Sequence, residues 1–360
     1  NLLEEEGLKF YLAYKDKIDS IFSDESAGNL SQTDTELLLS SMYVYYAKKV
    51  YDGIDSKKVK EMGWFLPRKN LSYENLLDSL LSDPKLLRKN EQQLFGQYYK
   101  LRDVLKKYRQ IEKNGGWNPI AIDSLEKTYK PSDSSKTIGQ IRQRLAQTGD
   151  LKLDSKSNVY DEELMAGILN YKKRNGFNTD YLIASKHIQR MNIPIENYIK
   201  TIIANMERCR WIDPELTKTD EYIIINIPSY QFFFKKNGQN KLESKVFVGK
   251  NMNKTVVLSS NIDKIVFSPY WNIPKSIIEN EIKYAIERDE NYLEKHNIEW
   301  YKGNLRQKPG PKNSLGLVKF IFPNSEDIYL HDTPSKDLFQ YEYRAYSHGC
   351  INIEKAKELD

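Results

Sequence analysis

The spacing of apolar residues changes character near residue 220. Before it, apolar side chains recur every three or four positions, as in the run from Leu37 to Tyr46. This period is typical of amphipathic helices. In the segment 222–227 the apolar side chains follow a period of two, which is that of a β-strand, and Pro228 ends the run. The pattern therefore predicts a helical first part and a β-rich second part.

Four regions follow from this pattern. Residues 1–130 are expected to form a helical scaffold domain, and residues 137–192 a small module of about three helices. Residues 193–215 return to helical spacing and would connect the module to the scaffold. The β-rich domain, a mixed-sheet sandwich, would span 220–360. The polar segment 130–135 has the composition of a linker. The predicted fold class is α+β and multidomain.

Three local features refine this prediction. Thr33 to Glu36 fits a capping box at a helix start. A second helix is predicted from Glu91 to Lys113, ending at Gly115-Gly116. Between about 274 and 313 helical spacing interrupts the strands, and such a helical insertion is a candidate lid over a site. A packing excursion without a gating role is the alternative.

Composition narrows the class of protein. The chain has 55 Lys and Arg against 50 Asp and Glu, a net charge of +5, and the basic residues are spread in short pairs. No concentrated basic stripe marks a nucleic-acid surface, and no run of about 18 apolar residues predicts a transmembrane segment. The chain starts at Asn1, which we interpret as a processed or trimmed end from which an export signal is missing.

The residues that could carry chemistry gather near the end of the chain. His331, His348 and Cys350 lie within twenty positions of one another. Proton transfer from Cys350 to His331 would give a thiolate–imidazolium pair, which is an activated nucleophile. Asp332 follows directly, and its side chain or backbone could orient the imidazole ring. A single disulfide between Cys209 and Cys350 stays open.

The neighbours of Cys350 suggest how a reaction could be stabilised. The backbone N–H groups of Gly349 and Cys350 could point at a developing oxyanion. Asn352 is expected to cap a closing helix through residues 354–357, whose positive end would lie near the thiolate. Two alternatives stay open, namely a purely structural cluster and a zinc site made by His331, Asp332, His348 and Cys350.

The motif also resembles a known family. His331, a spacer, and then Ser347-His348-Gly349-Cys350-Ile351-Asn352 is similar to the signature of the L,D-transpeptidases, whose catalytic module is called the YkuD-type domain. Similarity to the large, multidomain branch, which carries an insertion over its active site, extends the resemblance over about residues 137–360, and the resemblance is weaker before residue 137. It is found in Arg208–Trp211, Asn226–Pro228, Pro269–Pro274 and Pro309–Asn313.

The resemblance implies an activity. Cys350 would attack the carbonyl of the third residue of a peptidoglycan stem tetrapeptide, expel D-alanine and form a thioester, and an acceptor amine would then complete a 3→3 cross-link. His331 would be the base, His348 and Ser347 its support, and Gly349 part of the oxyanion site. The residues expected to bind substrate are Arg344, at a carboxylate, together with Asp332, Trp271, Tyr270, Asn352 and Tyr329.

The resemblance implies no cofactor and no metal, and a periplasmic or cell-envelope location. The partners would be the donor and acceptor stem peptides, and the site would react with carbapenems. Residues 137–192 resemble a peptidoglycan-binding module, although Lys172 stands where Gln is usual. An L,D-carboxypeptidase that resolves the thioester with water, and a non-catalytic wall-binding scaffold, are the competing functions.

Overall fold

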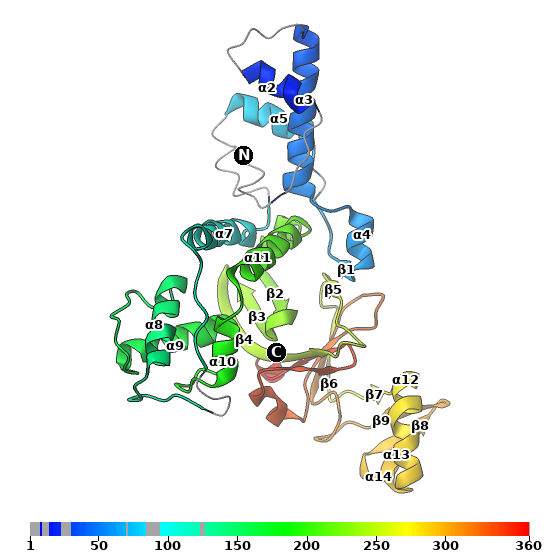
Figure 1. Cartoon of the computed structure of the whole chain (residues 1–360). Helices are drawn as coiled ribbons and strands as arrows, with labels where there is room; N and C mark the ends of the chain where they lie inside the picture. The colour runs from blue at the N-terminus through cyan, green and yellow to red at the C-terminus, as the bar shows by residue number, and fades with distance from the viewer. Residues whose placement is uncertain are drawn as a thin grey trace. The chain divides into compact units, whose positions relative to one another are not determined.

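The structure is a computed structural model of the chain, and it describes residues 8, 14–22, 30–69, 71–83, 94–122 and 127–359. Its internal contacts divide the chain into two units, of which the first holds residues 1–62 and 66–216 and the second residues 63–65 and 217–360 (Figure 1). The first unit is helical and the second is rich in strands, so the predicted α+β class is confirmed.

The first unit is built from helices of very different length. In chain order these are α2 (Lys15–Phe22), α3 (Gln32–Ala47), the π-helix η1 (Lys48–Asp52), α4 (Ser56–Glu61), α5 (Tyr73–Ser82), α7 (Gln97–Lys113), α8 (Lys136–Thr148), α9 (Glu162–Asn175), α10 (Ser185–Met191), α11 (Ile195–Arg210) and the 3₁₀ turn η2 (Pro214–Thr217). None of the described helices combines the length and the apolar character that a membrane crossing demands.

Helix ends follow local side-chain chemistry. The predicted capping box at Thr33 is wrong, because α3 begins two residues earlier, where the Ser31 hydroxyl accepts the Asp34 N–H at 3.1 Å. The predicted end of α7 at Lys113 is confirmed, and Gly115 and Gly116 follow with positive φ angles of 95° and 70°. The expected start at Glu91 lies outside the described residues.

Helices far apart in sequence share one core in the first unit. Side chains of α7 and α11 interlock with those of η1, and Tyr98, Leu105 and Met206 are among the residues that they bury. The two helices lie side by side in Figure 1. This packing is reinforced by Arg210, whose guanidinium donates to the Val50 carbonyl at 2.8 Å and to the Tyr98 hydroxyl at 3.0 Å.

Helices α8, α9 and α10 enclose a second core around Ile138, Leu164 and Ile188. The polar segment 130–135 is not a free linker, which corrects the prediction. The Ser132 N–H donates to the Tyr160 carbonyl at 2.9 Å, so this segment is paired with the loop before α9.

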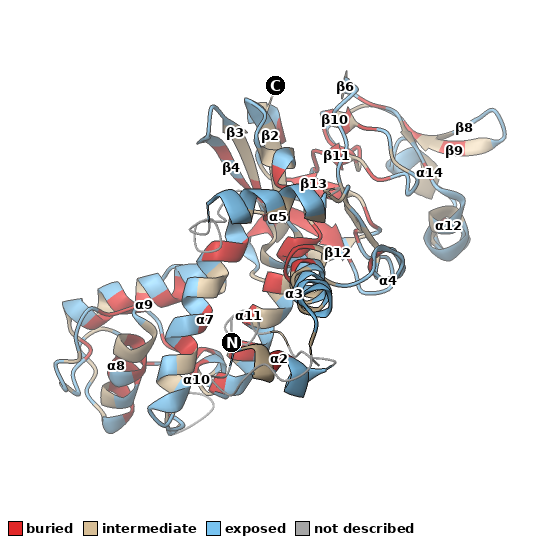
Figure 2. Cartoon of the chain, turned by 90° about the horizontal axis from the view of Figure 1, so that it is seen from above, coloured by how far each residue is buried: buried red, intermediate tan, exposed pale blue. Residues whose placement is uncertain are grey.

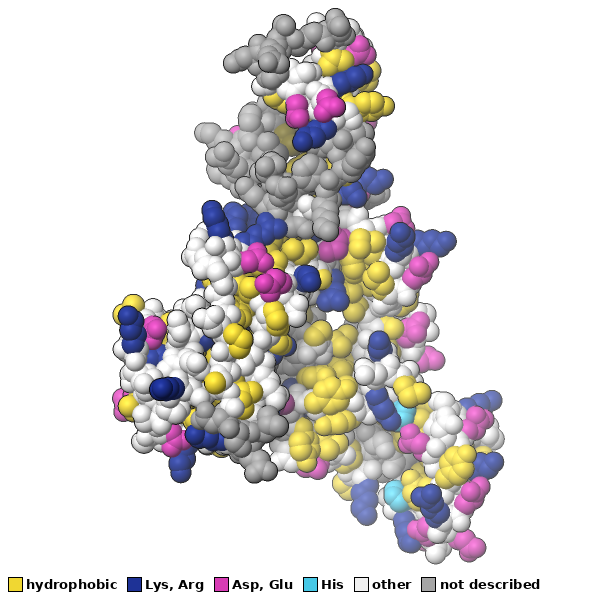
Figure 3. Space-filling view, in the orientation of Figure 1, with side chains coloured by type: hydrophobic (Ala, Val, Ile, Leu, Met, Phe, Trp, Pro, Cys, Tyr) yellow, Lys and Arg dark blue, Asp and Glu magenta, His cyan; other side chains and the backbone are white. Residues whose placement is uncertain are grey.

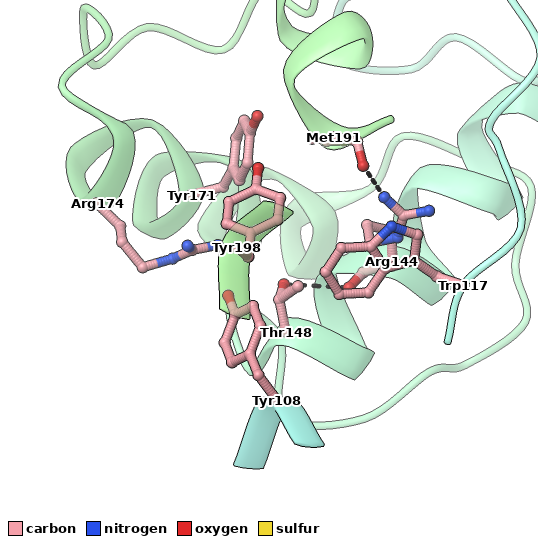
Figure 4. Close-up of a pocket in the computed structure, with 8 residues that line it drawn as sticks. All are labelled: Tyr108, Trp117, Arg144, Thr148, Tyr171, Arg174, Met191 and Tyr198. Carbon is pink, nitrogen blue, oxygen red and sulfur yellow. Dashed lines mark hydrogen bonds between the residues drawn. The ribbon is translucent and has the colours of Figure 1, made fainter. Parts of the chain in front are cut away.

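Aromatic and arginine side chains join the α8–α10 module to α7 and α11 (Figure 4). The Trp117 ring makes edge contacts with Tyr108 of α7 and Tyr198 of α11, at centroid distances of 6.1 and 5.7 Å. The guanidinium of Arg144, on α8, lies 4.4 Å from the Trp117 ring centre. Through these contacts the cluster packs the core of α8–α10 against the core of α7 and α11.

The second unit is organised by a mixed sheet. Its strands are β2 (Glu221–Asn226), β3 (Gln231–Lys236), β4 (Gln239–Gly249), β6 (Lys264–Phe267), β10 (Val318–Ile321), β11 (Leu330–His331), β12 (Ala345–Ser347) and β13 (Ile351–Ile353). The spatial order is β2-β3-β4-β13-β11-β10-β6, with β12 also paired to β4. A separate short pair joins β1 (Trp64–Phe65) to β5 (Val257–Leu258). The 3₁₀ turns are η3 (Ile227–Ser229), η5 (Lys336–Gln340) and η6 (Ala356–Leu359).

The middle of this sheet is its most buried part. Phe320 of β10, Leu330 of β11 and Ile353 of β13 are nearly inaccessible to solvent, and they belong to one apolar core. Figure 2 shows these strands largely in the colour of buried residues. Only the pairs β11–β13 and β12–β4 are parallel among the described strands of the sheet.

The predicted insertion forms a small subdomain with its own core around Ile273, Ile282 and Leu305. It begins with β7 (Trp271–Asn272) and continues through α12 (Lys275–Ile277), the π-helix η4 (Ile278–Ile282), α13 (Lys283–Arg288) and α14 (Tyr292–Lys295). The expected helical character then fails, because β8 (Ile298–Tyr301) and β9 (Asn304–Gln307) form a hairpin that pairs with β7. Charged side chains of both signs cover its surface (Figure 3, lower right).

Candidate active site

The register of the central strands brings the chemical residues of the motif onto one face of the sheet. His331 of β11 pairs with Asn352 of the parallel strand β13 and with Lys319 of the antiparallel strand β10. Side chains two positions apart share a face of a strand. Tyr329, which precedes β11, and Cys350, which precedes β13, therefore lie on the same face as His331, in the next row.

The imidazole of His331 is held by the residue that follows it. Its Nδ1 lies 2.6 Å from the backbone carbonyl oxygen of Asp332, and because a carbonyl can only accept, Nδ1 carries the proton. This leaves Nε2 as the basic nitrogen. The prediction that Asp332 orients the ring is thus met through its backbone.

Burial sets the charge of His331. The side chain is 6% exposed, and the loss of solvation lowers its pKa to about 4. The Asp332 carbonyl and carboxylate act in the opposite direction, and the nearby ammonium of Lys319 lowers the pKa further. His331 is therefore a neutral imidazole at pH 7, ready to accept a proton at Nε2.

The Cys350 thiol is also neutral in the resting state. Burial raises its pKa, although hydrogen bonds from the backbone and hydroxyl of Tyr329 and the charge of Lys319 act to lower it, and Asp327 acts to raise it. Sγ donates to the Asp327 carbonyl at 3.8 Å. The predicted thiolate–imidazolium pair is corrected on this point, because burial favours the uncharged form of both partners.

Tyr329 adjoins both His331 and Cys350. Its ring centre is 5.6 Å from that of His331, and its hydroxyl lies near the Cys350 thiol and the Trp271 indole. No hydrogen bond joins Sγ of Cys350 to the His331 ring among the described residues, a common condition of catalytic groups without substrate.

A tight turn presents Cys350. The Ser347 hydroxyl donates to the Cys350 carbonyl and accepts the Gly349 N–H at 3.2 Å. Gly349 has a φ of 121°, a region that favours glycine. Its carbonyl accepts from the Thr255 hydroxyl at 2.7 Å. The Gly349 N–H is thus already bonded to Ser347. Of the two N–H groups predicted to bind the oxyanion, the Cys350 N–H remains as a prediction.

His348 contacts the insertion. Its Nε2 lies 2.8 Å from a carboxylate oxygen of Glu281, on η4. The predicted support of His331 by His348 stays a prediction. Asn352 lies inside β13, and only the 3₁₀ turn Ala356–Leu359 follows it. The expected helix cap, and with it the helix-dipole argument for the thiolate, is wrong because the chain continues as a strand.

The two charged residues expected to bind substrate make internal contacts. The Asp332 carboxylate accepts from the Lys336 ammonium at 2.6 Å and from the Leu317 N–H at 2.9 Å. Arg344 is buried, and its guanidinium donates to the backbone carbonyls of Val246, Tyr230 and Tyr341. These bonds give both residues a supporting position, and a contact with substrate stays a prediction for each.

The aromatic residues Tyr270 and Trp271, at the start of the insertion, contact different neighbours. Trp271 lies near Tyr329. The centre of the Tyr270 ring lies 4.1 Å from the guanidinium of Arg306, on β9. That both residues shape a substrate groove stays a prediction.

The zinc and disulfide alternatives find no support in the geometry. Within the described ranges, no three His, Cys, Asp or Glu side chains come together as a ligand set. Cys209 and Cys350 are both free thiols, and burial in the core of the first unit raises the pKa of Cys209 to about 11.

Three neighbours of the motif were missed by the sequence reasoning. Lys319 lies across the strand from His331, the Asp327 carbonyl accepts from the thiol, and Thr255 holds the Gly349 carbonyl. Each contact depends on strand register or loop closure. The one available signal was the alternation within β10, which puts Lys319 on the face of the sheet opposite to that of its buried neighbours Val318 and Phe320.

Comparison with known proteins gives matches in both parts of the chain. Residues 220–359 match the family described as the L,D-transpeptidase catalytic domain, and residues 3–105 match a family described as a scaffold domain. A Haemophilus influenzae protein named "Putative L,D-transpeptidase" is 35% identical over 158 residues, which are 38% of this chain and 32% of that protein. The match thus spans about a third of the relative.

A crystal structure of the L,D-transpeptidase (residues 123–326) from Xylanimonas cellulosilytica aligns with 66% of this chain and 91% of that chain. The identity is 9% and the TM-score is 0.20, so this likeness is too weak to establish a fold.

Proposed function

We propose, from the match of residues 220–359 to the family of L,D-transpeptidase catalytic domains, that the protein cross-links peptidoglycan stem peptides through a thioester on Cys350. The observation that carries the proposal is the placement of Cys350, directly before β13, and of the neutral His331, on the adjacent parallel strand β11, with Tyr329 next to His331. A base with a free Nε2 beside a thiol is the minimum that acyl transfer needs.

The first half-reaction starts from two neutral groups. As Sγ of Cys350 attacks the carbonyl carbon of the third stem residue, its proton passes to Nε2 of His331, which becomes an imidazolium. The carbonyl oxygen takes up negative charge near the Cys350 N–H. The imidazolium then protonates the leaving nitrogen, the C–N bond breaks, and D-alanine departs from a thioester.

The second half-reaction returns the enzyme to its resting state. The amine of an acceptor stem attacks the thioester and gives its proton to His331. The C–S bond breaks, and the sulfur takes the proton back from the imidazolium. When the acceptor amine belongs to the third residue of another stem, the product is a 3→3 cross-link. When water attacks instead, the protein acts as an L,D-carboxypeptidase.

The same chemistry defines the partners and the setting. Donor and acceptor stem peptides are the proposed substrates, which places the working protein in the cell envelope. Residues 137–192 are proposed to be either a peptidoglycan-binding module or a spacer, and Lys172 is buried there in an ion pair with Asp180. Lys172 is therefore a structural residue of this module and not part of a binding surface.

The test uses the purified chain and tetrapeptide stems. Wild-type protein should release D-alanine and give cross-linked dimers by mass spectrometry, whereas Cys350→Ala should do neither. Tripeptides without dimers would show hydrolysis in place of transfer. A carbapenem should add its mass to Cys350 and leave Cys209 unmodified. Undiminished D-alanine release by Cys350→Ala, or no release by the wild type, would refute the proposal.

A further inference from the structure

Lys319 occupies a position beside the reactive groups that the mechanism above does not use. It is paired with His331 across the β10–β11 ladder. Its ammonium lies 3.5 Å from the centre of the ring of Tyr329, the residue that adjoins both His331 and Cys350. One cation thus faces the base, the phenol and the thiol together.

Lys319 does not have the surroundings of an ordinary surface lysine. The side chain is half-buried, and burial lowers its pKa. Among the described residues its ammonium makes no salt bridge and no hydrogen bond, and its contacts are the Tyr329 ring and the electrostatic fields of Cys350 and Asp327. A half-buried ammonium without a carboxylate partner costs free energy.

We propose that Lys319 is a positioning residue of this site: fixed over the Tyr329 ring, its ammonium reinforces the uncharged state that burial gives the His331 imidazole and balances the negative charge that gathers on the Cys350 sulfur. This inference rests on the proposed function for its purpose, although the electrostatic effect itself needs no substrate.

The charge acts at both ends of the proton transfer. Before attack, an ammonium near His331 disfavours a second positive charge on the ring, so Nε2 stays unprotonated. When the thiol proton leaves, sulfur becomes the negative partner of Lys319. The same attraction applies when the thioester is resolved and sulfur departs as an anion. Lys319 itself neither gives nor takes a proton in these steps.

Other charged groups face the same site and set the balance. Asp327 acts on Cys350 in the opposite sense to Lys319, and Asp332 favours the charged form of His331. Lys319 is the one cation that acts on both His331 and Cys350 among the described residues. Removing its charge should therefore change the acid–base behaviour of both groups, whereas removing its packing alone should not.

The experiment compares Lys319→Met, which keeps the length of the side chain without charge, with Lys319→Arg, which keeps a charge that cannot be lost. The full chain is alkylated with iodoacetamide across a range of pH, and the modification of Cys350 is read by peptide mass spectrometry. Cys209, buried in the first unit, reports the folding of that unit within the same sample, and cooperative thermal unfolding followed by circular dichroism reports the folding of the second unit. Lys319→Gln is a second neutral variant in case Lys319→Met fails to fold.

In the neutral variant, Cys350 should be alkylated about three- to tenfold more slowly near neutral pH, with the profile moved to more alkaline pH, because a nearby cation favours the thiolate. Lys319→Arg should follow the wild type. An unchanged profile in a folded neutral variant would overturn the proposal. An arginine variant as slow as Lys319→Met would also overturn it, since lysine would then be acting as a proton acceptor.

Alkylation uses no stem peptide, so it separates this inference from the proposed function. A chain that releases no D-alanine, but whose Cys350 profile depends on the charge at position 319, would refute the function and support the inference. Normal D-alanine release with a charge-independent profile would do the reverse.

Discussion

The neutral imidazole of His331 leads to a quantitative prediction for the response to acid. Acylation needs the unprotonated ring, and burial lowers the pKa of His331 to about 4. At about pH 5 roughly 90% of such a ring is neutral, compared with about 3% of a histidine with the ordinary pKa of about 6.5. The acylation rate should therefore be about thirtyfold higher at this pH than an exposed histidine would allow.

The same shift makes the stability of the second unit depend on pH. Because the folded pKa is below the unfolded value, the unfolded chain binds the proton first as the pH falls from about 6.5 to about 4. The free energy of unfolding should decrease through this window, by up to about 3 kcal/mol. His331→Gln, which has no proton to bind, should lack this part of the decrease.

Two measurements on the full chain test this reasoning. Imidazole resonances followed by NMR, with His331→Gln used for assignment, should show the His331 signal constant down to about pH 5. The rate of carbapenem acylation over the same range should stay near the rate measured at neutral pH, as long as proton transfer to the His331 ring limits the reaction. Titration of His331 near pH 6.5, with a parallel loss of acylation, would show that the ring is solvated and the neutral-pair mechanism wrong.

Substitutions at three positions test the supports of the site. Gly316→Ala places a Cβ 2.4 Å from the Asp332 carboxylate at a φ of 62°, and we expect a loss of roughly 1–2 kcal/mol or more in denaturant unfolding together with slower acylation; wild-type stability would contradict the close approach of Gly316 to Asp332. Ser347→Ala should slow acylation about tenfold by releasing the turn that presents Cys350, and Ser347→Thr should restore it; equal rates in both variants would remove the hydroxyl from the argument. Glu281→Gln should speed amide hydrogen exchange in residues 275–288, because it weakens the contact with His348. At this exposure the contact stabilises the insertion by at most about 1 kcal/mol. Unchanged exchange would show that the contact does not hold the insertion.

The strands and the motif were predictable, and the relations between strands were not. The strand predicted at residues 222–227 is found as β2 (Glu221–Asn226), because its alternation of side chains is a local property of the sequence and Pro228 ends it. Lys319 was overlooked because its meaning depends on register: it matters only when β10 lies next to β11 and pairs Lys319 with His331. The alternation in a sequence shows on which face of a strand a residue lies, but the pairing of strands decides which side chains are its neighbours.

Burial is the second quantity that residue types conceal. Cys350 and His331 suggest an ion pair when their ordinary pKa values are compared in water. Burial in the sheet removes solvent from both groups, and this loss of solvation favours the neutral pair. The hairpin at residues 298–307 was missed for a related reason, because its second strand (Asn304–Gln307) contains a single apolar residue and pairs with β7 only in its tertiary context.

The neutral resting pair also bears on whether the thioester goes to an amine or to water. In the proposed mechanism His331 accepts a proton from either nucleophile, and its basicity does not favour one over the other. The choice would then depend on which nucleophile reaches the thioester carbon while the donor is bound. Glu281 of the insertion contacts His348, two residues before Cys350, and Trp271 at the base of the insertion lies near Tyr329. If this attachment excludes water, Glu281→Gln should increase tripeptide at the expense of dimer without changing the rate of D-alanine release. A fall in D-alanine release with an unchanged ratio of tripeptide to dimer would instead assign the contact to acylation.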